Sequence, residues 1–266
     1  MKKILIIGKR GFIGNSLSKY LKKNFKITHK SFADLEKFGS NINNFNCVIN
    51  TSINKKYIEK RYNEKFDNDL KISNFIKNDK TKYIFLSTRK VYKSKANISE
   101  NSELFPKTNY SKNKLISENK LTKKISKNLV VLRISNIIGN KSKIKRIHNT
   151  FIDIFYQNIK KGLMFDNKKD FKDFISIDKF CEIMKNIITK DLKGIFNVSI
   201  GKKIYLNDIV FWLNKFNKKK IILKKNKIKN DCFFLNNKKL MSKIKIENSK
   251  KELKEYCLKI SKKKFS

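Results

Sequence analysis

The chain has 266 residues, of which 39% are hydrophobic and 12% aromatic, so it can bury the core of one large domain or of two unequal domains. Its 65 basic and 22 acidic residues give a formal net charge of +43. No apolar run approaches the roughly 20 residues of a membrane span. The apolar stretch at residues 4–7 is also too short for an export signal, which predicts a cytoplasmic protein.

The excess of lysine has two interpretations. A strongly basic surface is typical of proteins that bind nucleic acid or an anionic membrane. The lysines, however, are spread along the whole chain and accompanied by only 8 glycines and 1 proline, a pattern expected of codon drift in an A/T-rich genome. We favour codon drift, and the same positive charge suits an anionic small substrate.

The cysteines and histidines argue against a metal site, a disulfide framework and catalysis by a histidine dyad. The 4 cysteines contain no Cys-x-x-Cys pair, and there are only 2 histidines. The chemistry is therefore expected from Tyr, Lys, Ser or Thr side chains or from a bound cofactor.

In chain order, short apolar runs alternate with amphipathic stretches of helical length. The predicted strands are residues 3–7, 25–28, 47–50, 83–87 with an extension to 92, and 130–135; the predicted helices between them are 15–24, 67–78 and 111–126. This alternation predicts an α/β protein with a doubly wound parallel sheet, within a first domain of residues 1–160.

The pattern loosens after residue 140. A charged loop is predicted at 140–146, helices at 149–160, 178–189, 206–214 and 250–264, and a strand at 194–199. Ser249 and Glu252 have the spacing of a capping box before the last helix. These elements predict a smaller mixed α/β domain, residues 161–266, whose elements can interleave with the first. It is expected beside the carboxyl ends of the strands, where open α/β sheets bind ligands.

A glycine-rich turn follows the first predicted strand. Residues 8–14 read G-K-R-G-F-I-G and lead into a helix. Such glycines allow the backbone to approach a diphosphate, and the N-terminal amides of the helix face its negative charge. The residues predicted to bind a dinucleotide here are Gly8, Arg10, Gly11, Phe12, Ile13 and Gly14.

The segment after the second strand indicates which dinucleotide binds. NAD-binding folds usually place an acid about 20 residues after the first glycine, where it contacts the ribose 2′-hydroxyl. Here that region, around Lys30, has no acid. Lys30 and Arg10 suit a 2′-phosphate, which favours NADPH over NADH. Asp34 and Leu35 lie where the edge of the adenine would be contacted.

Tyr110 and Lys114 are four residues apart, on one face of a helix. A lysine ammonium beside a phenol favours the phenolate and lowers the tyrosine pKa from about 10, giving an acid and base usable near neutral pH. Tyr156 and Lys160 share this spacing. Only Tyr110, however, follows a strand end with a hydroxyl, Thr88, that can contact the same substrate oxygen, so Tyr156 is predicted to be a packing residue.

Together these segments resemble extended short-chain dehydrogenases/reductases and, more narrowly, the NAD-dependent epimerase/dehydratase family that acts on nucleotide sugars. The segments that carry the resemblance are residues 8–14, 85–92 (F-L-S-T-R-K-V-Y), 110–114, 132–139 (L-R-I-S-N-I-I-G), 173–178 (D-F-I-S-I-D) and 194–198 (G-I-F-N-V). The resemblance implies a Rossmann domain that binds the nicotinamide beside the tyrosine, and a small substrate domain.

The resemblance also implies roles for single residues. Tyr110 is the implied acid and base, and Lys114 holds the nicotinamide ribose and lowers the Tyr110 pKa. Thr88 binds the sugar oxygen, with Ser87 as its neighbour or substitute. Further implied contacts are Asn136 with the substrate near its diphosphate and Thr51 and Ser52 with the cofactor. A homodimer formed through the Tyr110 helix and a place in polysaccharide biosynthesis are implied as well.

Departures from the family pattern bear on the reaction. Dehydratases of the family place Asp-Glu after the Ser/Thr, whereas this chain has Arg89-Lys90, and Lys172 replaces the usual Arg before Asp-Phe-Ile. The expected reaction is therefore reduction of a 4-keto nucleotide sugar by NADPH, with epimerisation by tightly held NAD as the alternative. From another class, the alternative is a non-catalytic Rossmann protein that binds RNA through its charge, although no RNA-binding module is recognisable.

Overall fold

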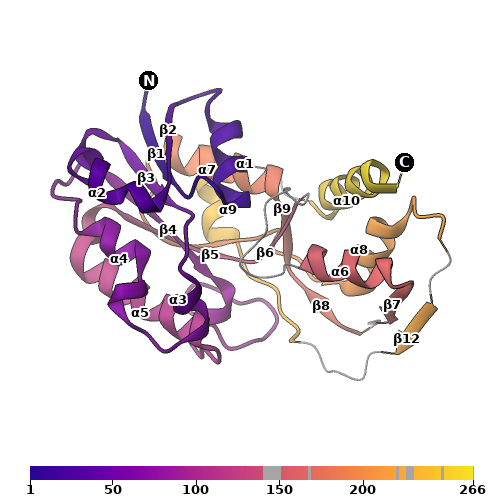
Figure 1. The fold of residues 1–266 in the computed structure, drawn as a ribbon. Coiled ribbons are helices and arrows are strands. Elements are labelled where there is room, and N and C mark those ends of the chain that lie inside the picture. The colour runs from indigo at the N-terminus through magenta and orange to yellow at the C-terminus, as the bar shows by residue number, and fades with distance from the viewer. Residues whose placement is uncertain (140–150, 167–168, 220–221, 226–230, 247–248, 266) are drawn as a thin grey trace. The chain divides into compact units, whose positions relative to one another are not determined.

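The computed structural model describes residues 1–139, 151–166, 169–219, 222–225, 231–246 and 249–265 (Figure 1). The chain forms two compact units: unit 1 comprises residues 1–93, 100–134 and 181–197, and unit 2 residues 94–99, 135–180 and 198–266. The chain thus passes between the units several times. The division into a cofactor domain and a substrate domain stays a prediction, and the predicted loop 140–146 lies outside the described residues.

Unit 1 is built on a six-stranded sheet with the strand order β10-β5-β4-β3-β1-β2. Its strands are β1 (Lys3–Ile7), β2 (Lys26–Lys30), β3 (Cys47–Asn50), β4 (Lys82–Thr88), β5 (Leu129–Ile134) and β10 (Gly194–Val198). The pairings β1–β2, β1–β3, β3–β4 and β4–β5 are parallel. The predicted α/β class with a doubly wound parallel sheet is confirmed.

Helices cover both faces of this sheet. They are α1 (Phe12–Leu21), α2 (Leu35–Phe38), α3 (Lys55–Glu59), α4 (Asn68–Ser73), α5 (Asn109–Ile125) and α7 (Ile177–Thr189); short 3-10 turns are η1 (Phe32–Asp34), η2 (Gly39–Asn44), η3 (Glu64–Phe66), η4 (Arg89–Val91) and η5 (Ser126–Asn128). Figure 1 shows α4 and α5 side by side, with α1 and α7 on the other side of the strands. Every residue of β3 and β5 is buried, as expected of strands covered on both faces.

Unit 2 is a smaller mixture of helices and short strands. Its helices are α6 (Phe151–Lys160), α8 (Leu206–Asn214), α9 (Lys238–Ile244) and α10 (Lys250–Phe265); its paired strands are β6 (Asn136–Ile138) with β9 (Phe174–Ser176), β7 (Leu163–Asp166) with β12 (Ile222–Lys225), and β8 (Phe171–Lys172) with β11 (Ile204–Tyr205). The core includes Phe174, Trp212 and Leu253. None of the described helices is long and apolar enough to cross a membrane.

The capping box predicted at the start of α10 is confirmed. Ser249 N–H donates to Glu252 Oε2 at 3.0 Å, and Glu252 N–H donates to Ser249 Oγ at 3.2 Å. These two bonds satisfy backbone donors that the first turn of a helix leaves without partners.

The helix predicted at 15–24 is observed at Phe12–Leu21, and two other predicted elements run well past the observed ones. The strand at 83–87 does not extend to residue 92: β4 ends at Thr88, and the chain turns into η4 because Thr88 Oγ1 accepts a hydrogen bond from Lys90 N–H at 3.3 Å. The helix at 67–78 ends at Ser73, whose hydroxyl bonds the Leu70 carbonyl, a local competition that weakens helices. The two- to four-residue strands of unit 2 were missed because such short segments carry no readable period.

Asp173 joins three segments of unit 2. Its buried carboxylate accepts hydrogen bonds from the N–H groups of Ile200 and Gly201, both at 3.2 Å, and of Leu235 at 3.0 Å. Burial raises the pKa of Asp173 to about 7, although these hydrogen bonds lower it. The carboxyl therefore binds its proton more tightly in the folded chain than in the unfolded one.

We expect this group to make the fold less stable as the pH rises from about 4 to about 7. Over that window the folded state keeps a proton that the unfolded state has released, so up to about 4 kcal/mol is lost and the loss levels off above pH 7. Urea unfolding at several pH values, compared with Asp173→Asn, isolates the contribution. Parallel pH slopes for the two proteins would contradict it.

Candidate active site

The glycine turn lies where the strand order reverses, between β1 and β3. Gly8 N–H donates to the Lys30 carbonyl at 2.9 Å, and Gly11 N–H donates to the Gly8 carbonyl at 3.0 Å. Thr51, the first residue after β3, donates from both its N–H and its hydroxyl to the Ile7 carbonyl at 2.8 Å. The turn and Thr51 therefore meet at the carboxyl ends of β1 and β3.

The three glycines of the turn are needed for different reasons. Gly8 has a φ of +121°, which other residues rarely adopt. A Cβ on Gly14 would lie 2.6 Å from both the Gly8 carbonyl oxygen and Thr51 Oγ1, so the close approach of α1 requires glycine. A Cβ on Gly11 would meet nothing nearer than 3.4 Å. Gly11, at the N-terminus of α1, therefore has room for a methyl group, and it is where the predicted contact with a diphosphate would lie.

We expect Gly14→Ala and Gly11→Ala to separate stability from cofactor binding. Gly14→Ala should lower the free energy of unfolding by about 1–3 kcal/mol, because the methyl group has no room. Gly11→Ala should leave stability nearly unchanged and weaken NADH and NADPH binding by about tenfold or more, because the methyl group takes the phosphate's space. Urea unfolding and nicotinamide fluorescence titration measure the two effects. Unchanged affinity in Gly11→Ala would show that no diphosphate lies there.

The residues predicted to select the cofactor flank this turn. The side chains of Arg10 and Lys30 are exposed, and the Lys30 carbonyl anchors the turn. Phe12 and Ile13 open α1 and are half-buried. The half-buried Asp34 ends η1, whereas Leu35 is only 4% exposed and belongs to the core of unit 1. The side chains of Arg10 and Lys30 are thus open to solvent, whereas the Leu35 side chain packs in the core.

A cap fixes Tyr110 in the first turn of α5. Thr108 Oγ1 accepts from Ser111 N–H at 3.2 Å, and Ser111 Oγ accepts from Thr108 N–H at 3.0 Å. Tyr110 is half-buried, one turn before Lys114. Helix α5 contacts β4, the strand that ends in Thr88, and η4, the turn that follows it.

The hydroxyls of Ser87 and Thr88 have different surroundings. Ser87 Oγ donates to Glu118 Oε1, and that buried carboxylate also pairs with Arg133 Nη2 at 2.7 Å. Thr88 Oγ1 accepts the Lys90 N–H bond at 3.3 Å. Since the Ser87 proton is given to Glu118, Thr88 is the stronger candidate to donate to a substrate oxygen.

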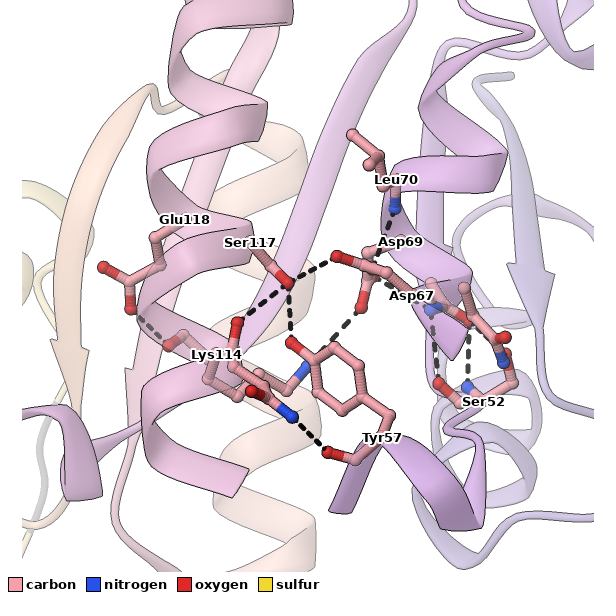
Figure 2. A network of polar contacts seen from close by, with 12 residues as sticks. Ser52, Tyr57, Asp67, Asp69, Leu70, Lys114, Ser117 and Glu118 are labelled. Atoms are coloured by element: carbon pink, nitrogen blue, oxygen red, sulfur yellow. Dashed lines mark hydrogen bonds and ion pairs between the residues drawn. The ribbon is translucent and has the colours of Figure 1, made fainter. Parts of the chain in front are cut away.

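Lys114 forms a buried ion pair that sequence reasoning missed (Figure 2). Its Nζ lies 3.4 Å from Asp69 Oδ2, both side chains are 6% exposed, and the ammonium lies 4.4 Å from the centroid of the Phe85 ring. Burial lowers the Lys114 pKa, but the negative charges of Asp69 and Asp67 raise it, and the net direction is upward. Lys114 therefore stays a cation near Tyr110.

A second buried acid, Asp67, caps α4 beside this pair (Figure 2). Its Oδ1 accepts from Leu70 N–H at 3.0 Å, and its Oδ2 accepts from Ser117 Oγ at 2.6 Å. The available sequence signal was two acids, two residues apart, in a chain with only 22 acidic residues. Their burial depends on α4 packing against α5, which no local pattern reveals.

The remaining predicted residues lie in different units. In unit 1, Ser52 Oγ donates to Asn50 Oδ1 at 2.6 Å and accepts from Asn68 Nδ2 at 3.0 Å. In unit 2, Asn136 Nδ2 donates to the Asp173 carbonyl at 3.0 Å. Unit 1 thus brings together the glycine turn with Thr51 and Ser52, and the α5 pair with β4, whereas the substrate contact of Asn136 stays a prediction.

The sequence matches a known protein family and a curated relative. Residues 4–199 match the model of the NAD dependent epimerase/dehydratase family. A curated dTDP-D-glucose 4,6-dehydratase from Dictyostelium discoideum is 25% identical over 264 residues, covering 79% of this chain and 61% of that protein. The chain therefore spans less than two thirds of this relative's length.

Solved structures share the fold over nearly the whole chain. A UDP-N-acetylglucosamine 4-epimerase from Methanobrevibacter ruminantium M1, in complex with UDP-N-acetylmuramic acid, has a TM-score of 0.78 at 19% identity and covers 98% of this chain and 97% of that chain. A dTDP-4-dehydrorhamnose reductase from Clostridium acetobutylicum has a TM-score of 0.75 at 18% identity, with 96% and 98% covered. At such identities the likeness shows the fold alone.

Proposed function

The chain belongs to the NAD dependent epimerase/dehydratase family, and from this premise we propose that it transfers a hydride between a nicotinamide cofactor and a carbon of a nucleotide-activated sugar. The observation that carries the proposal is the Tyr110–Lys114 pair at the start of α5, against the strand that ends in Thr88. Unit 1 also presents the glycine turn at the switch point of the same sheet.

The chain's own residues would bind and orient the cofactor, which supplies or accepts the hydride. The amides in the first turn of α1 would hold the diphosphate over Gly11, with Thr51 and Ser52 beside it. The exposed Arg10 and Lys30 support NADPH over NADH, because a 2′-phosphate adds negative charge at that end. Asp34 and Leu35 would flank the adenine.

Reduction of a 4-keto sugar is the reaction that we place first. Thr88 would hydrogen-bond the carbonyl oxygen while Tyr110 gives its phenolic proton to that oxygen. The cofactor would supply the hydride to the carbonyl carbon, so that C=O would become H–C–O–H. Lys114 would contact the nicotinamide ribose and stabilise the phenolate that remains on Tyr110.

The residues after Thr88 support reduction or epimerisation over dehydration. Elimination of water needs an additional acid and base, and this position holds Arg89, only 7% exposed within η4, and the exposed Lys90. Epimerisation through a transient keto sugar and tightly held NAD is the second candidate. A homodimer formed through α5, a cytoplasmic location and a place in polysaccharide biosynthesis belong to the same proposal.

The test is to mix the purified protein with NADH or NADPH and a panel of UDP- and dTDP-linked 4-keto sugars. A reductase consumes reduced cofactor in proportion to product, NADPH faster than NADH. Epimerised product without net cofactor consumption would replace reduction by epimerisation. Binding of RNA that weakens steeply with salt and ignores cofactor, with no turnover, would favour the non-catalytic alternative.

A further inference from the structure

Asp69 is held in place by three elements that pack around it. Its Oδ1 accepts hydrogen bonds from Asn50 Nδ2 on β3 at 2.9 Å and from Tyr83 OH on β4 at 2.7 Å. Its Oδ2 is left for Lys114 Nζ on α5, 3.4 Å away. A carboxylate with one oxygen anchored and the other aimed at an ammonium is built to fix that ammonium (Figure 2).

We propose that Asp69 is a positioning residue for the Tyr110–Lys114 pair: it fixes the Lys114 ammonium and offsets its charge, so that Tyr110 rests as a protonated phenol ready to act as an acid. This inference rests on the proposed function and deepens it. A phenol suits the reduction of a ketone, in which the tyrosine must give up a proton, whereas oxidation of an alcohol requires the phenolate first.

The charges around Tyr110 support this role. A buried lysine without a counter-ion exerts its full positive charge on the nearby phenol and draws it towards phenolate. A carboxylate at 3.4 Å makes the ion pair nearly neutral overall, so the phenol is favoured. Burial raises the Asp69 pKa, and the net direction is upward although the Lys114 charge lowers it. The geometry nevertheless favours the carboxylate, because Asn50, Tyr83 and Lys114 all donate to its oxygens. Lys114 keeps its own pKa above the usual range.

The other titratable groups around Asp69 do not take its place. Asp67 is equally buried, but its oxygens accept from Leu70, Ser117 and Tyr62. Burial raises the pKa of Tyr83, which donates its proton to Asp69, and that of Tyr57, whose hydroxyl bonds Ser117. Tyr57 and Tyr83 are therefore uncharged. Asp67 also raises the Lys114 pKa through its charge, but among the described residues Asp69 is the carboxylate that pairs with Lys114 Nζ.

The experiment compares Asp69→Asn with the matched control Asp67→Asn. The control also removes a buried carboxylate at the start of α4, one whose charge acts on Lys114 but whose oxygens bond Leu70, Ser117 and Tyr62. The first readout needs no substrate: the pH at which Tyr110 ionises, from ultraviolet difference absorbance of each variant minus the same variant carrying Tyr110→Phe. Asp69→Asn should lower that pH by about one unit or more, and Asp67→Asn by less than half as much.

The second readout is the pH profile of ketone reduction. The pH at which kcat falls on the alkaline side of the profile should be lower in Asp69→Asn, by the same amount as the Tyr110 titration. Asp69→Glu should restore part of this difference. A purely structural role would lower kcat at every pH and leave the pH of this fall unchanged. Tyr110 titrations and pH profiles that coincide in Asp69→Asn and the unsubstituted protein would overturn the inference.

The test still gives an answer if Asp69→Asn does not fold or if no substrate is found. If Asp69→Asn does not fold, Tyr83→Phe removes one anchor of Asp69 without changing the charge and should shift the Tyr110 titration in the same direction by a smaller amount. If no keto sugar is reduced, the titration still tests the role of Asp69. A shifted titration without turnover would reject the proposed function alone.

Discussion

Tyr110→Phe is expected to lower turnover by about 10²–10⁴-fold, the usual range for loss of a general acid. Phenylalanine keeps the ring in the first turn of α5 and removes only the hydroxyl that gives its proton to the substrate oxygen. The fold should be retained, because Tyr110 is only half-buried and the cap of α5 is formed by Thr108 and Ser111. Steady-state kcat, with circular dichroism as a check of folding, measures the effect.

Tyr156→Phe is the matched control, since Tyr156 also stands four residues before a lysine, Lys160. Its ring packs on the core of unit 2, with centroids 5.1 Å from Phe155 and 6.1 Å from Phe265, which confirms the prediction of a packing residue. Burial raises the pKa of Tyr156 to about 12. Turnover should stay close to that of the unsubstituted protein. Equal losses in both variants would remove Tyr110 from the chemistry.

Arg133→Met is expected to destabilise the fold by about 3–5 kcal/mol, because it leaves the Glu118 carboxylate buried without its cation. The two side chains are only 5% and 3% exposed, and Arg133 Nη1 also donates to Tyr92 OH at 2.9 Å. Methionine fills a similar volume, so the loss reports mainly the unpaired charge. Chemical denaturation measures it.

Two controls bear on this interpretation. Replacing both partners, as Arg133→Met with Glu118→Leu, should cost less than Arg133→Met alone, since no charge is then stranded. Lys120→Ala breaks the shorter pair with Glu64, at 2.6 Å, whose side chains are 41% and 61% exposed, and should cost less than about 1 kcal/mol. A double variant as unstable as the single one would show that packing, not charge, sets the cost.

The sheet of unit 1 could be predicted because its strands carry their own signals. The run at residues 3–7 and the run at 47–50 match β1 and β3, since each is apolar and followed by a polar turn. The strand pairs of unit 2 were not predicted, because strands of two to four residues show too little alternation and are specified by their partner strand. Ser73 likewise ended α4 early through a bond to its own backbone.

The candidate site likewise contains residues that could be predicted from the sequence and one that could not. Thr88, Tyr110 and Lys114 could be chosen from spacing, because one helical turn and one strand end fix where they lie. Asp69 could not, because an acid in a lysine-rich chain is expected at the surface, and its burial follows from the packing of α4 between β3, β4 and α5.

The order in which the chain visits the two units has a consequence for its synthesis. Unit 1 needs residues 181–197, which supply its edge strand β10, yet residues 135–180 of unit 2 are translated before them. A nascent chain therefore cannot finish the sheet when the first 134 residues have left the ribosome, and β5 waits with an open edge. The hydrophobic strand β5 therefore stays unpaired at one edge until β10, far along the sequence, has been synthesised. Such late pairing slows folding and favours chaperone assistance.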